Sequence, residues 1–186
     1  MAARSPDKLF DKVLIANRGE IALRIQRACR ELGIKTVAVH STADADAMHV
    51  RMADEAICIG PPSATDSYLN VPNIISAAEI SQSDAIHPGY GVLRENANFA
   101  RRCAEESITF VGPRPEMLAL FGDKMQARAL AEQCGVPLLR GTLQATSVDE
   151  ASEFFASLGQ GGAMMIKAVA GGGGGCWGRW GRGWGS

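Results

Sequence analysis

The chain has 186 residues, of which 46% are hydrophobic and 21% are charged, enough for one compact domain and part of a second. Nineteen Lys and Arg residues against 20 Asp and Glu residues leave a net charge of -1. This balance excludes a protein whose main function is to bind nucleic acid through a strongly basic surface. No apolar run approaches the roughly 20 residues that span a bilayer, and residues 1–10 contain no apolar segment of a secretory signal. The five cysteines form no CxxC pair, which indicates reduced thiols, so we expect a cytoplasmic protein.

Short apolar runs alternate with helical patterns over the first 122 residues. The runs typical of buried strands are at 12–16, 36–40, 56–59, 85–87 and 108–111. The helical patterns are at 20–32, 44–53, 71–80 and 95–106. We expect Gly33 to end the first helix with a positive φ, and Asp44 to cap the second. The alternation predicts an α/β fold with a Rossmann-like, doubly wound parallel sheet.

A dinucleotide site does not follow from this fold class. The first strand-to-helix turn contains a single glycine, Gly19, whereas the dinucleotide fingerprint needs three. A GxGxxG string does occur at residues 173–178, but no helical pattern follows it. We therefore expect neither NAD nor FAD.

The second segment of the sequence ends in a lysine followed by glycines. Helical patterns at 115–121 and 124–134 precede a third helix that opens with a capping box from Ser147 to Glu150. A strand at 163–169 contains Lys167, and an uninterrupted glycine run follows it. A strand lysine beside exposed backbone N–H groups can clamp nucleotide phosphates. The alternative is a lysine that extends to solvent beside a flexible linker, and spacing alone leaves both open.

Several longer motifs match one known family in order and spacing. They are residues 12–24, 37–41, 53–55, 67–70, 85–91, 95–100, 110–113, 122–124 and 166–168 with the glycines after them. The chain thus resembles the N-terminal part of biotin carboxylase, the ATP-grasp component of acetyl-CoA, propionyl-CoA and pyruvate carboxylases. The resemblance implies an N-terminal Rossmann-like domain at 1–122 and an incomplete ATP-grasp domain at 123–175, followed by an aberrant tail at 176–186.

The resemblance also implies an activity. Family members use ATP, Mg²⁺ and bicarbonate, through carboxyphosphate, to carboxylate biotin on a biotin carboxyl carrier protein that serves a carboxyltransferase. We expect the enzyme to be part of an acyl-CoA carboxylase in fatty acid biosynthesis, with acetyl-CoA as the first candidate acceptor. We expect the intact protein to be a homodimer. The two rival hypotheses are a non-catalytic docking or dimerisation module and another ATP-grasp carboxylate ligase.

Some positions of this sequence match family site residues, although no catalytic residue falls within the chain. The residues implied for the ATP site are Lys124, Lys167, Gly172, Gly173, Gly174 and Gly175. Tyr90 either lies near the biotin ring or has no ligand, with the two readings equally open. We interpret His87 as a core or turn histidine hydrogen-bonded to the backbone, and residues 17–20 as a helix start.

The sequence departs from the family pattern in two places. Val92, Leu93 and Arg94 stand where Phe-Leu-Ser is common, which removes an aromatic ring and adds a cation near the cleft. The family's fine placement of substrate therefore does not carry over to this sequence, whereas its fold does. Residues 176–186 replace the Arg-Gly-Met continuation, and they contain all three tryptophans of the chain. We interpret this tail as a reading-frame error or truncation after Gly175, rather than as a stacking tail for single-stranded nucleic acid. With the Mg²⁺ ligands missing from the chain, we expect it to be inactive alone.

Overall fold

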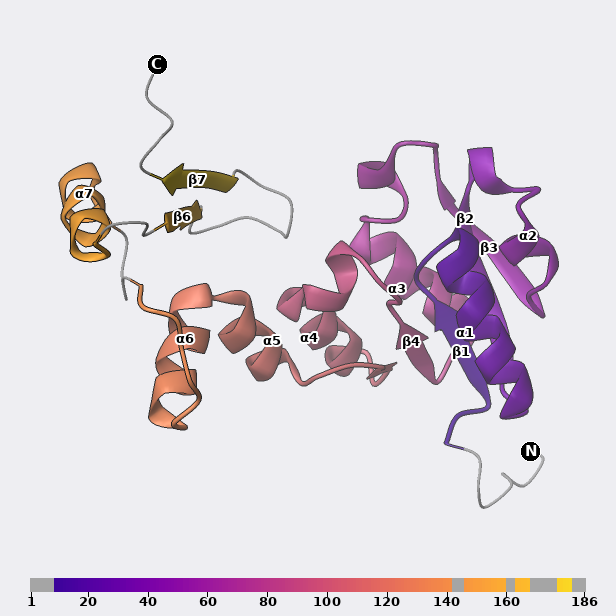
Figure 1. The fold of residues 1–186 in the computed structure, drawn as a ribbon. Helices are drawn as coiled ribbons and strands as arrows, with labels where there is room; N and C mark the ends of the chain where they lie inside the picture. Colours follow the sequence, from indigo (N-terminus) through magenta and orange to yellow (C-terminus); the bar gives the residue numbers. More distant parts are fainter. Residues whose placement is uncertain (1–8, 142–145, 160–162, 168–176, 182–186) are drawn as a thin grey trace. The chain divides into compact units, whose positions relative to one another are not determined.

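The computed structural model describes residues 9–141, 146–159, 163–167 and 177–181 (Figure 1). The chain divides into two units, Met1–Ala119 and Leu120–Ser186, which are described separately below. Over the described ranges, no helix combines the length and the apolar character needed to cross a membrane.

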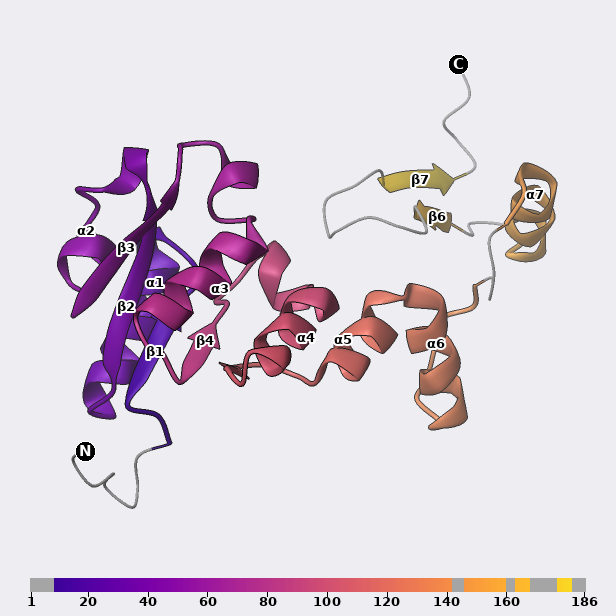
Figure 2. The ribbon, with the colours of Figure 1, turned by 180° about the vertical axis from the view of Figure 1, so that it is seen from behind.

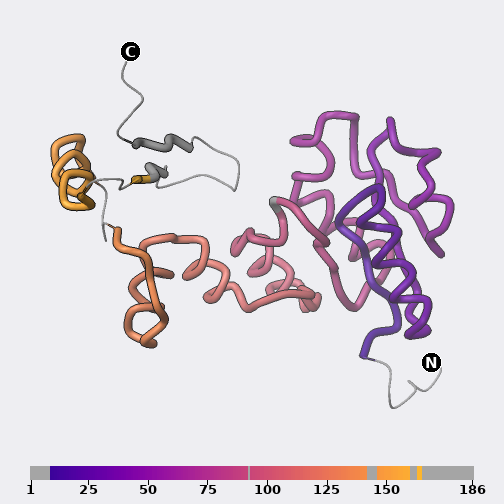
Figure 3. The backbone as a smooth tube through the Cα atoms, viewed as in Figure 1, coloured from indigo at the N-terminus to yellow at the C-terminus, as the bar shows by residue number. Residues whose placement is uncertain are grey.

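A five-stranded parallel sheet forms the centre of the first unit. Its strands are β1 (Lys12–Ile15), β2 (Lys35–Ser41), β3 (Glu55–Gly60), β4 (Ala85–His87) and β5 (Thr109–Phe110). Their order is β3-β2-β1-β4-β5, and every neighbouring pair is parallel. Figure 3 follows the same chain as a tube, from its indigo N-terminal residues through the magenta segments that complete the first unit. The predicted α/β class and doubly wound sheet are therefore confirmed.

Helices cover both faces of this sheet. They are α1 (Gly19–Glu31), α2 (Met48–Arg51), α3 (Val71–Ile80) and α4 (Ala97–Glu105). Three short 3-10 turns join them: η1 (Thr42–Asp44), η2 (Ala64–Asp66) and η3 (Val92–Glu95). Helices α1 and α2 lie on one face in Figure 1, and α3 lies on the opposite face in Figure 2 together with α4. This two-sided arrangement follows from right-handed crossovers that run in opposite directions from β1.

The strands are apolar throughout because both of their faces are buried. In β1, Leu14 packs into the larger cluster, which includes Ile74, Ile86 and Phe99, whereas its neighbour Val13 packs into the smaller cluster on the opposite side. The rings of Phe99 and Phe110 meet edge to face, with centroids 5.7 Å apart, which attaches α4 to β5.

Most helix ends follow the sequence signals, with one exception. Gly33 has a φ of +68° after α1, as predicted. The expected cap at Asp44 is wrong: Asp44 ends η1, and α2 begins after Ala47 without a side-chain cap. The Oδ2 atom of Asp44 instead accepts hydrogen bonds from Tyr68, Arg18 and Ser41, so the carboxylate binds these side chains rather than a helix start.

The second unit contains short helices and a two-stranded sheet. Helix α5 (Pro115–Gly122) leads into it, followed by α6 (Lys124–Gln133), α7 (Val148–Ser157), β6 (Ala163–Lys167) and β7 (Trp177–Gly181). The capping box predicted at the start of α7 is present, since the Ser147 and Glu150 side chains each accept the other's backbone N–H. Strand β7 lies within the segment that the sequence sets apart as a tail, and it pairs antiparallel with β6.

Candidate functional site

The carboxyl ends of β1 and β4 meet at the centre of the sheet, where the strand order reverses. Ile15 is in register with His87, and the Ala16 N–H donates to the His87 carbonyl oxygen at 2.9 Å. Asn17 and Arg18 follow β1 at the same edge as the loop of residues 87–91 that follows β4. Ligands of open α/β sheets bind at such a reversal, outside the carboxyl ends of the strands.

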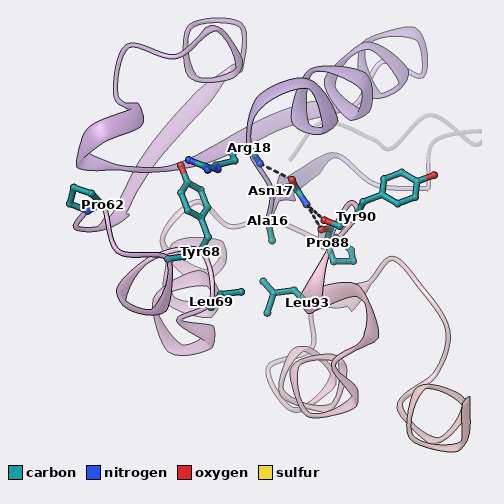
Figure 4. Close-up of a pocket in the computed structure, with 10 residues that line it drawn as sticks. Ala16, Asn17, Arg18, Pro62, Tyr68, Leu69, Pro88, Tyr90 and Leu93 are labelled. Carbon is teal, nitrogen blue, oxygen red and sulfur yellow. Dashed lines mark hydrogen bonds between the residues drawn. The ribbon is translucent and has the colours of Figure 1, made fainter. Parts of the chain in front are cut away.

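Asn17 connects these two segments. Its side-chain amide nitrogen donates to the carbonyl oxygens of Pro88, at 2.9 Å, and Tyr90, at 2.6 Å, while its oxygen accepts from the Arg18 N–H at 2.9 Å. Figure 4 shows these contacts at the wall of a cavity. A single short side chain therefore determines the course of the loop after β4.

Glycine and histidine shape the same loop. Gly89 has a φ of +62°, and a Cβ there would lie 2.7 Å from the Asn17 amide nitrogen and 2.8 Å from the Ile21 Cγ2 atom, so only glycine fits. The Gly89 N–H donates to Nδ1 of His87 at 3.0 Å, which leaves the proton of the neutral ring on Nε2. Burial lowers the pKa of His87. The interpretation of His87 as a core or turn histidine bonded to the backbone is confirmed by this hydrogen bond, with His87 as the last residue of β4.

Two cavities open at this loop. The smaller, of about 220 Å³, lies between the end of β1, the loop at 62–69 and the loop after β4. The larger, of about 750 Å³, lies between α1, β1, β4 and residues 111–118. Its walls are mainly apolar, and Arg24, Arg94 and Glu95 supply charge. Tyr90 lines both cavities, and in Figure 4 its ring points away from the smaller one.

A polar cluster stands beside the smaller cavity. The Tyr68 hydroxyl donates to an Asp44 carboxylate oxygen at 2.6 Å and accepts from the Ser41 N–H at 3.0 Å. The Arg18 guanidinium donates to the same Asp44 oxygen at 3.1 Å and lies over the Tyr68 ring, 5.4 Å from its centroid. The Tyr68 hydrogen bond, followed by Arg18, holds the pKa of Asp44 below its usual value. Burial and the Asp44 carboxylate raise the pKa of Tyr68.

Sequence reasoning missed this cluster as a unit. The sequence predicts a helix cap at Asp44, and it marks Tyr68 only as part of a family motif. The available signal was their position, since Asp44 follows β2 and Tyr68 follows β3, at the edge of the sheet where ligands bind.

The remaining predicted site residues belong to the second unit. Lys124 is the exposed first residue of α6, directly after Asp123, whose side chain caps that helix by accepting from the Met125 and Gln126 N–H groups. Lys167 is the last residue of β6. Gly172, Gly173, Gly174 and Gly175 lie outside the described residues. Tyr90 belongs to the first unit, so a site shared by Tyr90 and these lysines stays a prediction.

Among the side chains that the structure describes, no group of three or more His, Cys, Asp or Glu residues is placed to hold a metal ion.

The fold and the loop at the strand reversal define a class: an α/β domain that places a glycine-rich loop and an aromatic side chain at the carboxyl edge of its parallel sheet. Residues 9–118 match the family described as "Biotin carboxylase, N-terminal domain". The chain belongs to the biotin carboxylase family, an ATP-dependent ligase family.

Relatives and solved structures agree with this membership. The chain is 55% identical over 166 residues to the biotin carboxylase of Nostoc sp., a match that covers 89% of this chain and 37% of the relative. It superposes with a TM-score of 0.83 and 44% identity on the Campylobacter jejuni biotin carboxylase in complex with beta-gamma-ATP, covering 91% of this chain and 38% of the other.

A third comparison is the biotin carboxylase domain of the Hydrogenobacter thermophilus 2-oxoglutarate carboxylase, a dimer in complex with MgADP, ADP and bicarbonate. There the TM-score is 0.80 with 46% identity, over 88% of this chain and 36% of the other. The chain thus spans little more than a third of the length of these proteins.

Proposed function

We propose that this chain supplies the N-terminal domain, residues 1–122, and the first part of the ATP-grasp domain, residues 123–175, of a biotin carboxylase. The reaction is the ATP-dependent carboxylation of biotin by bicarbonate. The identity of 55% to the Nostoc biotin carboxylase supports this assignment. The ligands named for the solved relatives, beta-gamma-ATP in one and MgADP with bicarbonate in another, are the substrates and products that such a reaction handles.

The loop of residues 87–91 carries the proposal. It stands at the strand reversal, it is held on one side by Asn17, and it presents Tyr90, whose side chain is 65% exposed, beside the apolar larger cavity. An aromatic ring of that kind can pack against the bicyclic head group of biotin, which combines an apolar sulfur-containing ring with a planar ureido ring. We therefore assign Tyr90 to the biotin side of the site.

We assign the binding of ATP to residues of the second unit. Lys124 and Lys167 would each place an ammonium group against phosphate oxygens, and Gly172 to Gly175 would offer backbone N–H groups to the same oxygens. ATP with Mg²⁺ supplies the activation of bicarbonate. The residues that bind Mg²⁺ would come from the part of the relatives that this chain does not match.

Partners and pathway follow from the same proposal. The biotin would be carried on a biotin carboxyl carrier protein and delivered to a carboxyltransferase, with acetyl-CoA as the first candidate acceptor and fatty acid biosynthesis in the cytoplasm as the setting. The intact enzyme would be a homodimer, as the Hydrogenobacter domain is. The 186-residue chain alone would be inactive.

A chimera tests the proposal directly. Residues 9–175 of this chain replace the aligned residues of the Nostoc biotin carboxylase, and the release of phosphate from ATP is measured with and without bicarbonate and free biotin. We expect phosphate release that depends on both. In the chimera, Lys124→Ala and Lys167→Ala should each lower it about 100-fold, the scale on which a donor that stabilises transition-state charge acts.

The matched control is Lys35→Ala, which removes an exposed lysine of β2 and should leave the rate unchanged. A folded chimera that hydrolyses ATP without any response to biotin would overturn the proposed reaction. If an amine or amino acid stimulates it instead, the chain belongs to another ATP-grasp ligase. The carrier is tested by replacing free biotin with carrier proteins from acetyl-CoA and other carboxylases.

A further inference from the structure

We propose that Arg94 is a positioning residue that holds the ring of Tyr90 at the rim of the larger cavity and neutralises Glu95 beside it. This inference rests on the proposed function for its role in catalysis, but the cluster itself is a property of the 186-residue chain. It concerns a position where the sequence departs from the family pattern.

The geometry joins three side chains of one turn. Arg94 lies in η3, and its Nε and Nη2 atoms both donate to the same Glu95 carboxylate oxygen, at 3.2 and 2.8 Å. The guanidinium carbon also lies over the Tyr90 ring, 5.3 Å from the centroid. All three residues line the larger cavity. One cation therefore contacts an aromatic face and a carboxylate at the same time.

The shared arginine makes the two weak contacts support each other. Arg94 and Glu95 side chains are 45% and 65% exposed, and an isolated ion pair at such a site contributes little because water screens it and ordering two side chains costs entropy. Here the ion pair orders the guanidinium, so the ring contact requires no further loss of arginine freedom. A cation over an exposed ring favours one ring orientation about twofold to fivefold.

The backbone of Tyr90 is already fixed from the other side. Asn17 binds its carbonyl oxygen, and the flanking Gly89 and Gly91 have φ values of +62° and +118°. What remains free is the rotation of the tyrosine side chain, and Arg94 restricts that rotation. A ring held in advance binds a ligand that packs against it more tightly because less freedom is lost on binding. The pairing with Glu95 also keeps that carboxylate from repelling an anionic substrate at the rim.

The first experiment examines the cluster in the chain itself by NMR. The chain has two tyrosines, so ring labelling gives one signal set for Tyr90 and one for Tyr68, which serves as an internal control. We expect nuclear Overhauser contacts between the Tyr90 ring and Arg94 side-chain protons. Arg94→Gln should abolish these contacts and move the Tyr90 signals toward their random-coil values, whereas Arg94→Lys should restore part of the shift. Unchanged Tyr90 signals in Arg94→Gln would overturn the cluster.

The matched control is Arg101→Gln, which removes another exposed arginine of the first unit, bonded only weakly to Asn98 at 3.4 Å. It should leave both tyrosines unchanged. A shift of Tyr68 in Arg94→Gln would mean that the unit as a whole has changed, which would also contradict a local role for Arg94.

The second experiment measures the catalytic consequence in the chimera. Arg94→Gln should raise the KM for free biotin about twofold to fivefold, with a smaller change in kcat, and Arg94→Lys should recover part of the loss. If the chimera is active and its KM for free biotin is the same with Arg94 and with Arg94→Gln, the positioning role is overturned while the proposed function stands. A folded chimera without biotin-dependent activity overturns the proposed function, and the NMR result then decides the cluster independently.

Discussion

The side-chain amide of Asn17 donates a hydrogen bond of 2.6 Å to the backbone carbonyl oxygen of Tyr90, a residue 73 positions later in the sequence. The same nitrogen donates to the Pro88 carbonyl oxygen at 2.9 Å. These bonds continue the connection of β1 and β4 past the last pair of the sheet, Ile15 with His87. The loop that presents Tyr90 lies past the last paired residues of β1 and β4, and the Asn17 side chain therefore holds it in place of strand pairing.

Removal of the Asn17 amide should loosen this loop. Asn17→Ala leaves the Pro88 and Tyr90 carbonyl oxygens without their donor, and we expect the free energy of unfolding to fall by about 1 kcal/mol, since the site is partly exposed. Asn17→Asp should lower it at least as much, because a carboxylate would face two carbonyl oxygens. Urea unfolding measures the stability, and hydrogen exchange of the Gly89 amide, which donates to Nδ1 of His87, measures the opening of the loop.

The control for this pair is Asn98→Ala, which changes an exposed asparagine of α4 and should stay within about 0.5 kcal/mol of the wild type. If Asn17→Asp were as stable as the wild-type chain, the amide would not be the donor that holds the loop.

Gly89 and Gly33 allow steric crowding to be separated from backbone strain. Both have a left-handed φ, +62° and +68°, but a Cβ at Gly33 would meet nothing within 4 Å, whereas at Gly89 it would collide with Asn17 and Ile21. Gly33→Ala should cost about 1–2 kcal/mol from φ alone. Gly89→Ala should cost about 1–3 kcal/mol more from crowding, or should displace the loop instead.

Unfolding in urea gives the two stabilities, and the Asn17 side-chain amide signals in an NMR spectrum report the displacement. If Gly33→Ala and Gly89→Ala lower the free energy of unfolding equally and the Asn17 signals do not move, the loop accommodates a side chain at residue 89.

The sheet could be predicted because its signal is local. The runs around Val13, Val37 and Ile86 are apolar on both faces, as a buried parallel strand requires, and helical patterns between them leave few topologies once crossovers are right-handed. The wrong cap at Asp44 has the opposite cause. A short acidic residue before a helical pattern predicts a cap from its neighbours alone, yet its carboxylate is bound by Tyr68 and Arg18.

The same limit applies to the candidate site. Tyr90 could be singled out from a motif, but its two restraints could not: Asn17 lies 73 positions earlier in the sequence, and the stacking of Arg94 depends on the turn at η3. Contacts between side chains and distant backbone follow from the assembled sheet, and no sequence period encodes them. The roles of Lys124 and Lys167 rest on the resemblance and stay predictions.

Asp44 should contribute a stability that depends on pH in one direction. The Tyr68 hydrogen bond and Arg18 lower its folded pKa below the ordinary 3.8, so the folded state binds the proton more weakly than the unfolded state. The contribution is therefore complete above about pH 5 and is lost as the pH falls through the folded pKa. Because the side chain is 23% exposed, we expect Asp44→Asn to cost about 1–2 kcal/mol at pH 7.

The difference between wild type and Asp44→Asn should shrink progressively as the pH falls below the ordinary Asp value of 3.8, as measured by urea unfolding at several pH values. Asp46→Asn is the matched control, since Asp46 is an exposed neighbour on the same loop, and it should be nearly neutral throughout. A cost that stays constant down to pH 3 would mean that the carboxylate charge is not what Tyr68 and Arg18 stabilise.

The cysteines should divide into two classes by reactivity. Cys58 and Cys134 are exposed, whereas Cys29 and Cys103 are buried. Burial raises the pKa of the Cys103 thiol to about 12, so at pH 8 only ~10⁻⁴ of it is the reactive thiolate. Burial, and then Asp54, raise the pKa of Cys29. Iodoacetamide at pH 8 should therefore modify Cys58 and Cys134 in the folded chain and reach Cys29 and Cys103 only after unfolding.

Peptide mapping by mass spectrometry assigns each modification, and the peptide that contains Cys176 is analysed separately because that residue lies outside the described ranges. The rate at Cys103 then reports global opening, since Cys103 packs beside Phe99 in the larger core cluster of the sheet. Addition of urea below the unfolding transition should leave its rate far behind that of Cys58. Comparable rates at the two thiols in the folded chain would contradict the packing of α4 against β5, because a thiolate can form there only if that helix separates from the sheet.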